Sequence, residues 1–320
     1  MTLLPVCPEL HAALTAVQSA AQLCQTVRRD RQATALRKPD QSPVTVADYG
    51  AQALIAAHLG ETFPTDPLVG EEDASLLAAD VLAQITDYVQ LQRSQVSPET
   101  VAAWIQRGKG QPGDRFWTLD PIDGTKGYVR GDQYAIALAL IVEGQVEVAA
   151  IAAPALDGPD GALFAAVRGQ GAWQIQGDRV IPLQVSARQS TAALRLESVE
   201  REHGHPAWQD AIATRAGLVT PARAVDSLVK YALIARGEAD LYLRLVNPES
   251  DRRENIWDHA AGVLLLQEAG GCVSDQTGRS LDFGAGNKLF NNQGIAASNA
   301  ACHAAVLAAL RAQTPLLELV

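Results

Sequence analysis

Cysteine and aromatic residues are scarce in this chain of 320 residues, and aromatic residues make up only 5% of it. The four cysteines are widely separated and form no C-x-x-C pair; they are Cys7, Cys24, Cys272 and Cys302. Such spacing is atypical of a disulfide framework or a zinc site and is typical of a protein kept in a reducing compartment. We therefore expect buried thiols and a cytoplasmic location.

Long apolar runs and an excess of positive charge are absent as well. No segment approaches the ~20 apolar residues of a membrane-spanning helix, and residues 1–5 lack the charged and apolar regions of a secretion signal. Lysine and arginine number 26 against 36 aspartates and glutamates, which leaves a formal charge of -10. A nucleic-acid polymer or an anionic membrane would need a basic surface, so we expect neither as a partner. A small phosphorylated metabolite stays compatible, since one pocket of an acidic protein can be cationic.

The hydrophobic periodicity predicts two halves that meet near residue 184. In residues 1–184, helical spacing covers 7–29, 46–58 and about 98–105, and β-rich runs cover 68–69, 116–119, 134–142, 146–154 and 163–167. Glu143-Gly144-Gln145 joins two of these runs as a hairpin, so this half is an α+β unit with a mostly antiparallel sheet. In residues 185–320, helices at 226–235, 257–268 and from 299 alternate with strands at 241–245 and 294–298, as in an α/β unit.

Asp120-Pro121-Ile122-Asp123-Gly124-Thr125 is the most informative segment, because it sets two carboxylates, a backbone carbonyl and a hydroxyl at the end of an apolar run. Two carboxylates about 5 Å apart repel by ~3 kcal/mol at an effective dielectric of about 20. A divalent cation between them would turn this repulsion into attraction. On this segment alone, a surface turn explains the residues equally well.

Two more acidic residues follow apolar runs, Glu71 after Val69-Gly70 and Asp258 after Ile256-Trp257. Strand ends are where open sheets usually assemble their sites, and oxygen-only ligation selects hard cations such as Mg²⁺. We expect Gly70 to allow the sharp turn that directs Glu71 inward. Two simpler explanations stand beside this one: residues 71–73 can form a solvated acidic loop, and Asp258 can stabilise the first turn of its helix through the helix dipole.

Together, three motifs resemble the signatures of the inositol monophosphatase superfamily of metal-dependent, lithium-sensitive phosphatases. They are Val69-Gly70-Glu71-Glu72, Asp120-Pro121-Ile122-Asp123-Gly124-Thr125 and Trp257-Asp258-His259-Ala260-Ala261-Gly262. The resemblance runs from about residue 43 to residue 299 and implies the layered α-β-α-β-α sandwich of the inositol monophosphatase and fructose-1,6-bisphosphatase type, of mixed α+β and α/β class. It also implies two or three Mg²⁺ ions bound by Glu71, Asp120, Asp123, Asp258 and the carbonyl of Ile122. Gly124, Thr125 and Asp258 would contact the substrate.

Within this superfamily, the surrounding segments are most similar to the 3′(2′),5′-bisphosphate nucleotidases. Residues 42–49 resemble the segment that carries their catalytic aspartate, which makes Asp48 the expected proton acceptor together with Thr125. Residues 126–133 are similarly typical. Residues 200–203, 226–231 and 240–244 resemble nucleotide-contacting segments and imply four substrate residues: His203, Ser227, Lys230 and Arg244.

Simple chemistry agrees with several of these roles. Thr125 opens a predicted helix, where exposed amide groups suit a phosphate and the hydroxyl can orient the attacking water. Ser227 and Lys230 are three residues apart on a predicted helix, so that both can reach a second phosphate. Each residue also has a simpler explanation. Thr125 can be an N-cap only, and Lys230 a surface lysine whose stem lies along apolar groups. His203 can be an ordinary loop histidine, and Arg244 a solvated strand residue.

The sequence therefore predicts a Mg²⁺-dependent phosphomonoesterase that acts on adenosine 3′,5′-bisphosphate and on its sulfated relative, 3′-phosphoadenylyl sulfate, in sulfur metabolism. The expected partner is this small phosphorylated nucleotide, and the chain is expected to be a monomer or a homodimer. A phosphatase of inositol monophosphate or inositol polyphosphates with the same metals is the alternative. The alternative from another class is a non-catalytic, metal-linked binding module.

Overall fold

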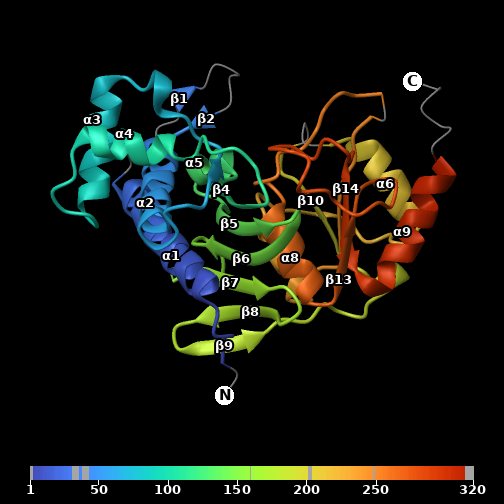
Figure 1. Cartoon of the computed structure of the whole chain (residues 1–320). Helices are drawn as coiled ribbons and strands as arrows, with labels where there is room; N and C mark the ends of the chain where they lie inside the picture. The colour runs from blue at the N-terminus through green and yellow to red at the C-terminus, as the bar shows by residue number, and fades with distance from the viewer. Residues whose placement is uncertain are drawn as a thin grey trace.

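Helices and sheets alternate in an α-β-α-β-α order across the structure (Figure 1). The structure is a computed structural model, and it describes residues 3–30, 36–37, 43–158, 160–200, 204–247 and 249–313. Helices α1 (Pro8–Arg29) and α2 (Val46–Thr62) cover the outer face of a large sheet, and α7 (Val229–Ala235) and α8 (Ala260–Glu268) lie between it and a smaller sheet. The far face of the smaller sheet is covered by α6 (Pro206–Arg215) and α9 (Ala300–Gln313). The predicted layered sandwich is confirmed.

The larger sheet has seven strands in the order β3-β4-β5-β6-β7-β8-β9. Their bounds are β3 (Leu68–Gly70), β4 (Arg115–Asp123), β5 (Ala135–Val142), β6 (Gln145–Ala153), β7 (Ala162–Val167), β8 (Gly171–Gln176) and β9 (Arg179–Pro182). β3 pairs with β4 in parallel, and the other neighbouring pairs are antiparallel. Between β5 and β6, Glu143 and Gly144 have positive φ angles of 50° and 74°, as a two-residue hairpin turn requires. Both the antiparallel sheet and its hairpin agree with the sequence.

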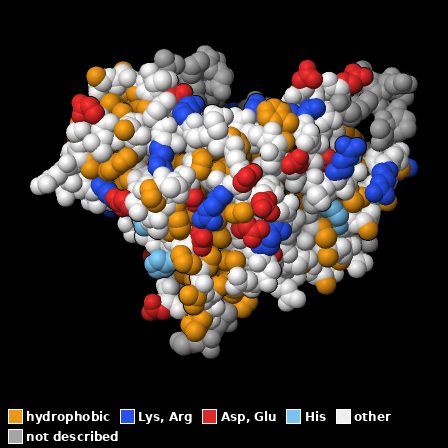
Figure 2. Space-filling model, viewed as in Figure 1, with side chains coloured by type: hydrophobic (Ala, Val, Ile, Leu, Met, Phe, Trp, Pro, Cys, Tyr) orange, Lys and Arg blue, Asp and Glu red, His pale blue; other side chains and the backbone are white. Residues whose placement is uncertain are grey.

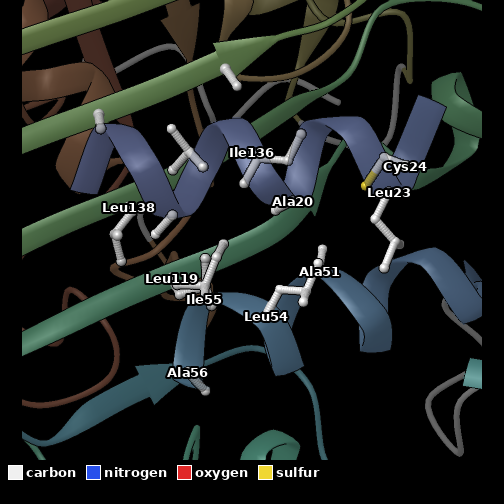
Figure 3. Close-up of a cluster of buried hydrophobic side chains, with 14 of the residues drawn as sticks. Ala20, Leu23, Cys24, Ala51, Leu54, Ile55, Ala56, Leu119, Ile136 and Leu138 are labelled. Carbon is white, nitrogen blue, oxygen red and sulfur yellow. The ribbon is translucent and has the colours of Figure 1, made fainter. Parts of the chain in front are cut away.

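Strand β5 is buried on both faces because helices cover the sheet on both sides. Ile136 and Leu138 lie in the core beneath α1 and α2, where they meet residues such as Leu54 (Figure 3). Ala137 and Ala139 point to the opposite core, which includes α7 and α8. The small alanine side chains let α8 pack close to the sheet, which explains why the segment is continuously apolar instead of alternating.

The smaller sheet has five strands in the order β11-β10-β12-β14-β13. Their bounds are β10 (Arg195–Glu197), β11 (Arg223–Ala224), β12 (Leu241–Arg244), β13 (Gly271–Ser274) and β14 (Ile295–Asn299). β10 is parallel to β11 and β12, whereas β14 is antiparallel to β12 and β13. The C-terminal end of β12 brings Arg244 towards the larger sheet.

The remaining elements are short or lie at the edges of the layers. They are β1 (Leu36–Arg37), β2 (Pro43–Val44), α3 (Ala79–Gln90), α4 (Pro98–Gln106), α5 (Thr125–Arg130) and the 3-10 turns at Ala74–Leu76 and Ser190–Ala192.

Side-chain caps mark the first residues of the two helices α1 and α9. Cys7 accepts from the amide of Leu10 at the start of α1, and the Asn299 side chain accepts from the amide of Cys302 at 2.9 Å and so caps α9.

Several elements differ from those that the sequence predicts. The helix predicted at 226–235 begins only at Val229, because Ser227 has a φ of 64° that is incompatible with a helix. The helix predicted at 257–268 begins at Ala260, and residues 257–259 form a turn before it. We predicted no regular structure for α3, α6, β8, β9, β10 and β13. Position 184 falls between β9 and β10; the division into halves at this point remains a prediction.

From the composition we expected buried thiols and no membrane-spanning helix. All four cysteines are free; Cys24 and Cys302 are buried, but Cys7 and Cys272 are only partly buried. The expectation of buried thiols is thus correct for two and wrong for two, and Cys7 lies near the surface because it caps α1. Among the described residues, no helix combines the length and the apolar character that a membrane crossing requires.

Candidate active site

Asp48 is buried in the first turn of α2, where both of its carboxylate oxygens are engaged. Oδ2 accepts hydrogen bonds from the backbone amide and the hydroxyl of Thr45, each at 2.7 Å, and so completes a capping box. Oδ1 accepts from the hydroxyl of Thr125 at 3.1 Å. The cap therefore fixes the orientation of the carboxylate, and one oxygen faces Thr125.

Thr125 is the first residue of α5, directly after strand β4. Gly124 joins the two elements with a φ of 87°, which a residue with a side chain rarely adopts. The Thr125 hydroxyl lies 3.1 Å from the carbonyl oxygen of Ile122 as well as 3.1 Å from Asp48. The hydroxyl has one proton to donate, so it can give it to either oxygen and accept a hydrogen bond from another molecule.

Glu71 follows β3 and reaches the end of β4 through the parallel pairing of these strands. Gly70 lies opposite Leu119, and the amide of Glu71 donates to the carbonyl of Leu119 at 3.2 Å. Gly70 does not have a positive φ, so the expected sharp turn is not its role. A Cβ at this position would lie 2.5 Å from Oε1 of the buried Gln52, whose side-chain amide pairs with the backbone of Glu72. Close packing against Gln52 is what requires glycine here.

Asp120 and Asp123 lie on either side of a register shift at the end of β4. Asp120 is buried, and its Oδ1 accepts from the amide of Ile122 at 3.1 Å. The Asp123 carboxylate accepts from the amide of Leu228, which lies just before α7. The end of β4 thus meets the loop that leads from β11 to α7 in the second half of the chain.

Electrostatics place Glu71, Asp123 and Asp258 in one neighbourhood. Burial raises the pKa of Asp123 to about 6, Lys230 and Arg244 oppose the rise, and the Glu71 carboxylate adds to it. Burial also raises the pKa of Asp258 well above its usual range, with further contributions from Asp123 and Glu71. These three carboxylates repel one another in a desolvated site, as expected where a cation would bind.

Two cations from the second half of the chain face these carboxylates. Lys230, on α7, is buried; its Nζ donates to the carbonyl of Val225 at 3.0 Å and lies 5.1 Å from the ring centre of Tyr242. Burial lowers its pKa to about 8, although Asp123 counteracts this. Lys230 is therefore not the surface lysine of the alternative explanation.

Ser227 does not share a helix face with Lys230, which corrects the sequence interpretation. It lies before α7 with a φ of 64°, and its Cβ is 3.1 Å from the position that a Cβ on Gly124 would take. Ser227 is thus close to the N-terminus of α5 through a tight loop contact. His203 lies outside the described residues.

Arg244 ends β12 between two carboxylates. Its Nη2 is 2.5 Å from Oε2 of Glu254 and 4.0 Å from Oδ2 of Asp258.

Glu254 was not predicted from the sequence, because Asp251-Arg252-Arg253-Glu254 is a run of charges typical of a solvated loop. Among the described residues, Glu254, Asp258 and His259 form a group whose potential ligand atoms lie within 4.8 Å of one another and that is able to hold a metal ion. Within this group, Glu254 already has a cationic partner, because it forms an ion pair with Arg244.

Helix α5 is tied to the second half by a network around Arg130. Arg130 lies 2.7 Å from Glu200 and 2.7 Å from Asp226, and Lys126 lies 3.0 Å from the other oxygen of Glu200. Asp226 precedes Ser227 directly. The network therefore connects the helix that begins at Thr125 with the loop that leads to α7.

The surface in Figure 2 carries acidic and basic side chains side by side, and neither sign dominates a wide area of the described residues drawn there. A polyanion would need a broad basic surface. A small anionic ligand would need only a few cations, such as the buried Lys230 and the partly buried Arg244.

Comparison with known proteins adds to this geometry. A model of the inositol monophosphatase family matches residues 8–314. The chain is 40% identical to a 3′(2′),5′-bisphosphate nucleotidase of Schizosaccharomyces pombe over 91% of each chain. It is 38% identical to a 3′(2′),5′-bisphosphate nucleotidase of Emericella nidulans, with 95% of this chain and 97% of that one covered.

Two solved structures have a similar fold. An IMPase of Thermotoga maritima has a TM-score of 0.67 at 22% identity, covering 95% of this chain and 97% of its own. An inositol monophosphatase from Anabaena has a TM-score of 0.65 at 20% identity, covering 97% of both chains. At this level of identity, the two structures support the fold alone.

Proposed function

The chain belongs to the inositol monophosphatase family, and from this premise we propose that it hydrolyses the 3′-phosphate of adenosine 3′,5′-bisphosphate. It is a phosphoric monoester hydrolase, as its relatives named 3′(2′),5′-bisphosphate nucleotidase are. The observation that carries the proposed chemistry is the contact between the Thr125 hydroxyl and the Asp48 carboxylate at 3.1 Å, at the end of the strand that carries Asp120 and Asp123. A non-catalytic binding module would have no need of this pair.

Thr125 and Asp48 activate the attacking water. The water donates a proton to Oγ1 of Thr125, while the Thr125 hydroxyl passes its own proton to Oδ1 of Asp48. The Thr45 hydrogen bonds to Oδ2 hold the carboxylate in place during this transfer. The water oxygen then forms a bond to phosphorus, the bond from phosphorus to the 3′-oxygen breaks, and the 3′-oxygen takes a proton from solvent.

The donor set fits Mg²⁺. Glu71, Asp120, Asp123, Asp258 and the carbonyl of Ile122 are the residues that would hold it, and all offer oxygen. Burial and mutual repulsion raise the pKa of Asp123 and of Asp258, so a bound cation would relieve an unfavourable charge. When bound, two or three Mg²⁺ ions neutralise the phosphate and acidify the attacking water.

The substrate is proposed to be a bisphosphate because the site has two cations in addition to the metal ligands, the buried Lys230 and the partly buried Arg244. Lys230 and Arg244 both act electrostatically on Asp123, from α7 and from the end of β12. They suit the phosphate that is not hydrolysed, with Ser227 at the entrance to α7 and Gly124 and Thr125 on the hydrolysed group. The sulfated relative, 3′-phosphoadenylyl sulfate, carries anionic charge at the same end and is the second proposed substrate.

The proposed compartment is the cytoplasm, which the four free cysteines support. The proposed role in sulfur metabolism follows from the proposed sulfated substrate alone. Phosphate release by the purified chain tests the activity itself. With Mg²⁺, we expect release from adenosine 3′,5′-bisphosphate to exceed release from adenosine 5′-monophosphate by orders of magnitude. EDTA should abolish it. Equal release from both nucleotides would contradict the substrate proposal.

A further inference from the structure

Glu254 is a buried carboxylate whose backbone is fixed from both sides. Its carbonyl accepts from the amide of Leu289 at 2.9 Å, and the next residue, Asn255, forms a β-bridge with Lys288. Glu254 is only 5% exposed. A buried carboxylate in a rigid backbone is costly unless it meets a cation, so its position calls for a specific partner.

The partner is Arg244, and Asp258 is a second carboxylate within reach of the same atom. Nη2 of Arg244 lies 2.5 Å from Oε2 of Glu254 but 4.0 Å from Oδ2 of Asp258. The shorter distance is a close ion pair, whereas 4.0 Å exceeds a hydrogen bond. Glu254 and Asp258 thus compete for one guanidinium, and Glu254 holds it.

Two further side chains lie near the Glu254 carboxylate and can interact with it electrostatically. Its Oε1 lies 3.4 Å from Nε of Arg252, and its Oε2 lies 3.8 Å from Nε2 of His259. The His259 ring is oriented in turn by a hydrogen bond of 2.9 Å between its Nδ1 and the Tyr231 hydroxyl. Tyr231 is next to Lys230 on α7, so the same network borders both cations of the site.

We propose that Glu254 is a positioning residue that binds the guanidinium of Arg244 and thereby keeps it from pairing with Asp258. Asp258 then remains available to a metal ion, and Arg244 remains available to the substrate. Without the Glu254 charge, the partly buried arginine would turn to Asp258, which lies 4.0 Å away, and neutralise a proposed metal ligand. The inference deepens the proposed function and rests on it for the role of Asp258 as a metal ligand.

Binding of Mn²⁺, a paramagnetic substitute for Mg²⁺, tests the proposal without any nucleotide. Electron paramagnetic resonance measures the free ion in titrations of the wild-type protein, Glu254→Gln, Arg244→Ala and the double variant. We expect Glu254→Gln to weaken Mn²⁺ binding about 10–100-fold, as losses in the shell around metal ligands do. Arg244→Ala should bind Mn²⁺ at least as tightly as the wild type. In the Arg244→Ala background, Glu254→Gln should change binding by no more than about threefold.

Glu238→Gln is the matched control, because Glu238 also pairs with an arginine, Arg236, at an exposed position. It should bind Mn²⁺ like the wild type, and thermal unfolding verifies that each variant is folded. Unchanged binding in Glu254→Gln, or an equal loss with and without Arg244, would overturn the proposal. So would weaker binding by Arg244→Ala, a variant that does not depend on the folding of Glu254→Gln. If the wild type binds Mn²⁺ but does not cleave the nucleotide, only the substrate assignment fails.

Discussion

The hydroxyl of Thr125 lies 3.1 Å from Oδ1 of Asp48, although 77 residues separate them in the sequence. The capping box of α2 and the abrupt start of α5 after Gly124 create this contact. Two local rules of helix geometry therefore produce the proposed proton-transfer pair.

Replacing Thr125 by Ala should lower kcat about 10²–10⁴-fold, the range that a positioned proton-transfer group contributes. Thr125→Ser keeps the hydroxyl and should retain most of the activity. Steady-state kinetics at saturating Mg²⁺ measures both. A Thr125→Ala variant with near-normal kcat would remove the pair from the mechanism.

Asp123→Asn should separate activity from stability. Because the pKa of Asp123 is raised from 3.8 to about 6 in the metal-free fold, the folded state binds more protons than the unfolded state between these values. The free energy of unfolding contributed by this group therefore falls as pH rises from 3.8 to about 6. At pH 7 without metal, Asp123→Asn should be as stable as the wild type or more stable, while its kcat in Mg²⁺ falls by orders of magnitude. Chemical denaturation in EDTA at both pH limits, together with kinetics, measures this. Near-normal turnover in Mg²⁺ would contradict the assignment.

Li⁺ should inhibit the enzyme at low concentration, as the family resemblance implies. This small, hard cation would compete for a Mg²⁺ position framed by the carboxylates of Glu71 and Asp123. Initial rates in LiCl and in KCl at equal ionic strength isolate the effect of the ion from screening. Equal inhibition by the two salts would rule out this selectivity.

Lys230→Ala should weaken the use of the bisphosphate and spare a monophosphate. Loss of a charge-assisted contact to the phosphate that is not hydrolysed costs ~1.5–3 kcal/mol, or about 10–150-fold in kcat/KM. Because burial lowers the pKa of Lys230 to about 8, kcat/KM for the bisphosphate should also fall above that pH as the amine loses its proton. Lys230→Arg should remove this fall. Equal losses on both substrates would mean that Lys230 acts on the metal site or the fold.

The strand ends and the carboxylates of the proposed metal site could be predicted because each motif is local. Glu71, Asp120 and Asp123 follow apolar runs directly, so the sequence alone indicates where they lie. Ser227 could not be placed, because its φ of 64° depends on close packing against Gly124 from the other half of the chain. The role of Gly70 was misjudged for a similar reason, since Gln52, which excludes a side chain there, is distant in the sequence.

Glu254 shows a further limit of the sequence. It is surrounded by charged residues and resembles a solvated loop, yet it is buried because the 287–289 segment pairs with its backbone and Arg244 meets its side chain. Long-range pairing of this kind leaves no periodic signal. Strands β8 and β9 were missed because their mixed polar sequence at the edge of the sheet lacks a clear alternation.

We propose that this protein hydrolyses a nucleotide bisphosphate in preference to an inositol phosphate. The most direct measurement compares kcat/KM for phosphate release from adenosine 3′,5′-bisphosphate and from inositol 1-phosphate, on the same purified protein in Mg²⁺. Lys230 and Arg244 predict a preference for the nucleotide of about 10–150-fold, the value of one charge-assisted contact, or more. Faster release from inositol 1-phosphate would contradict the account.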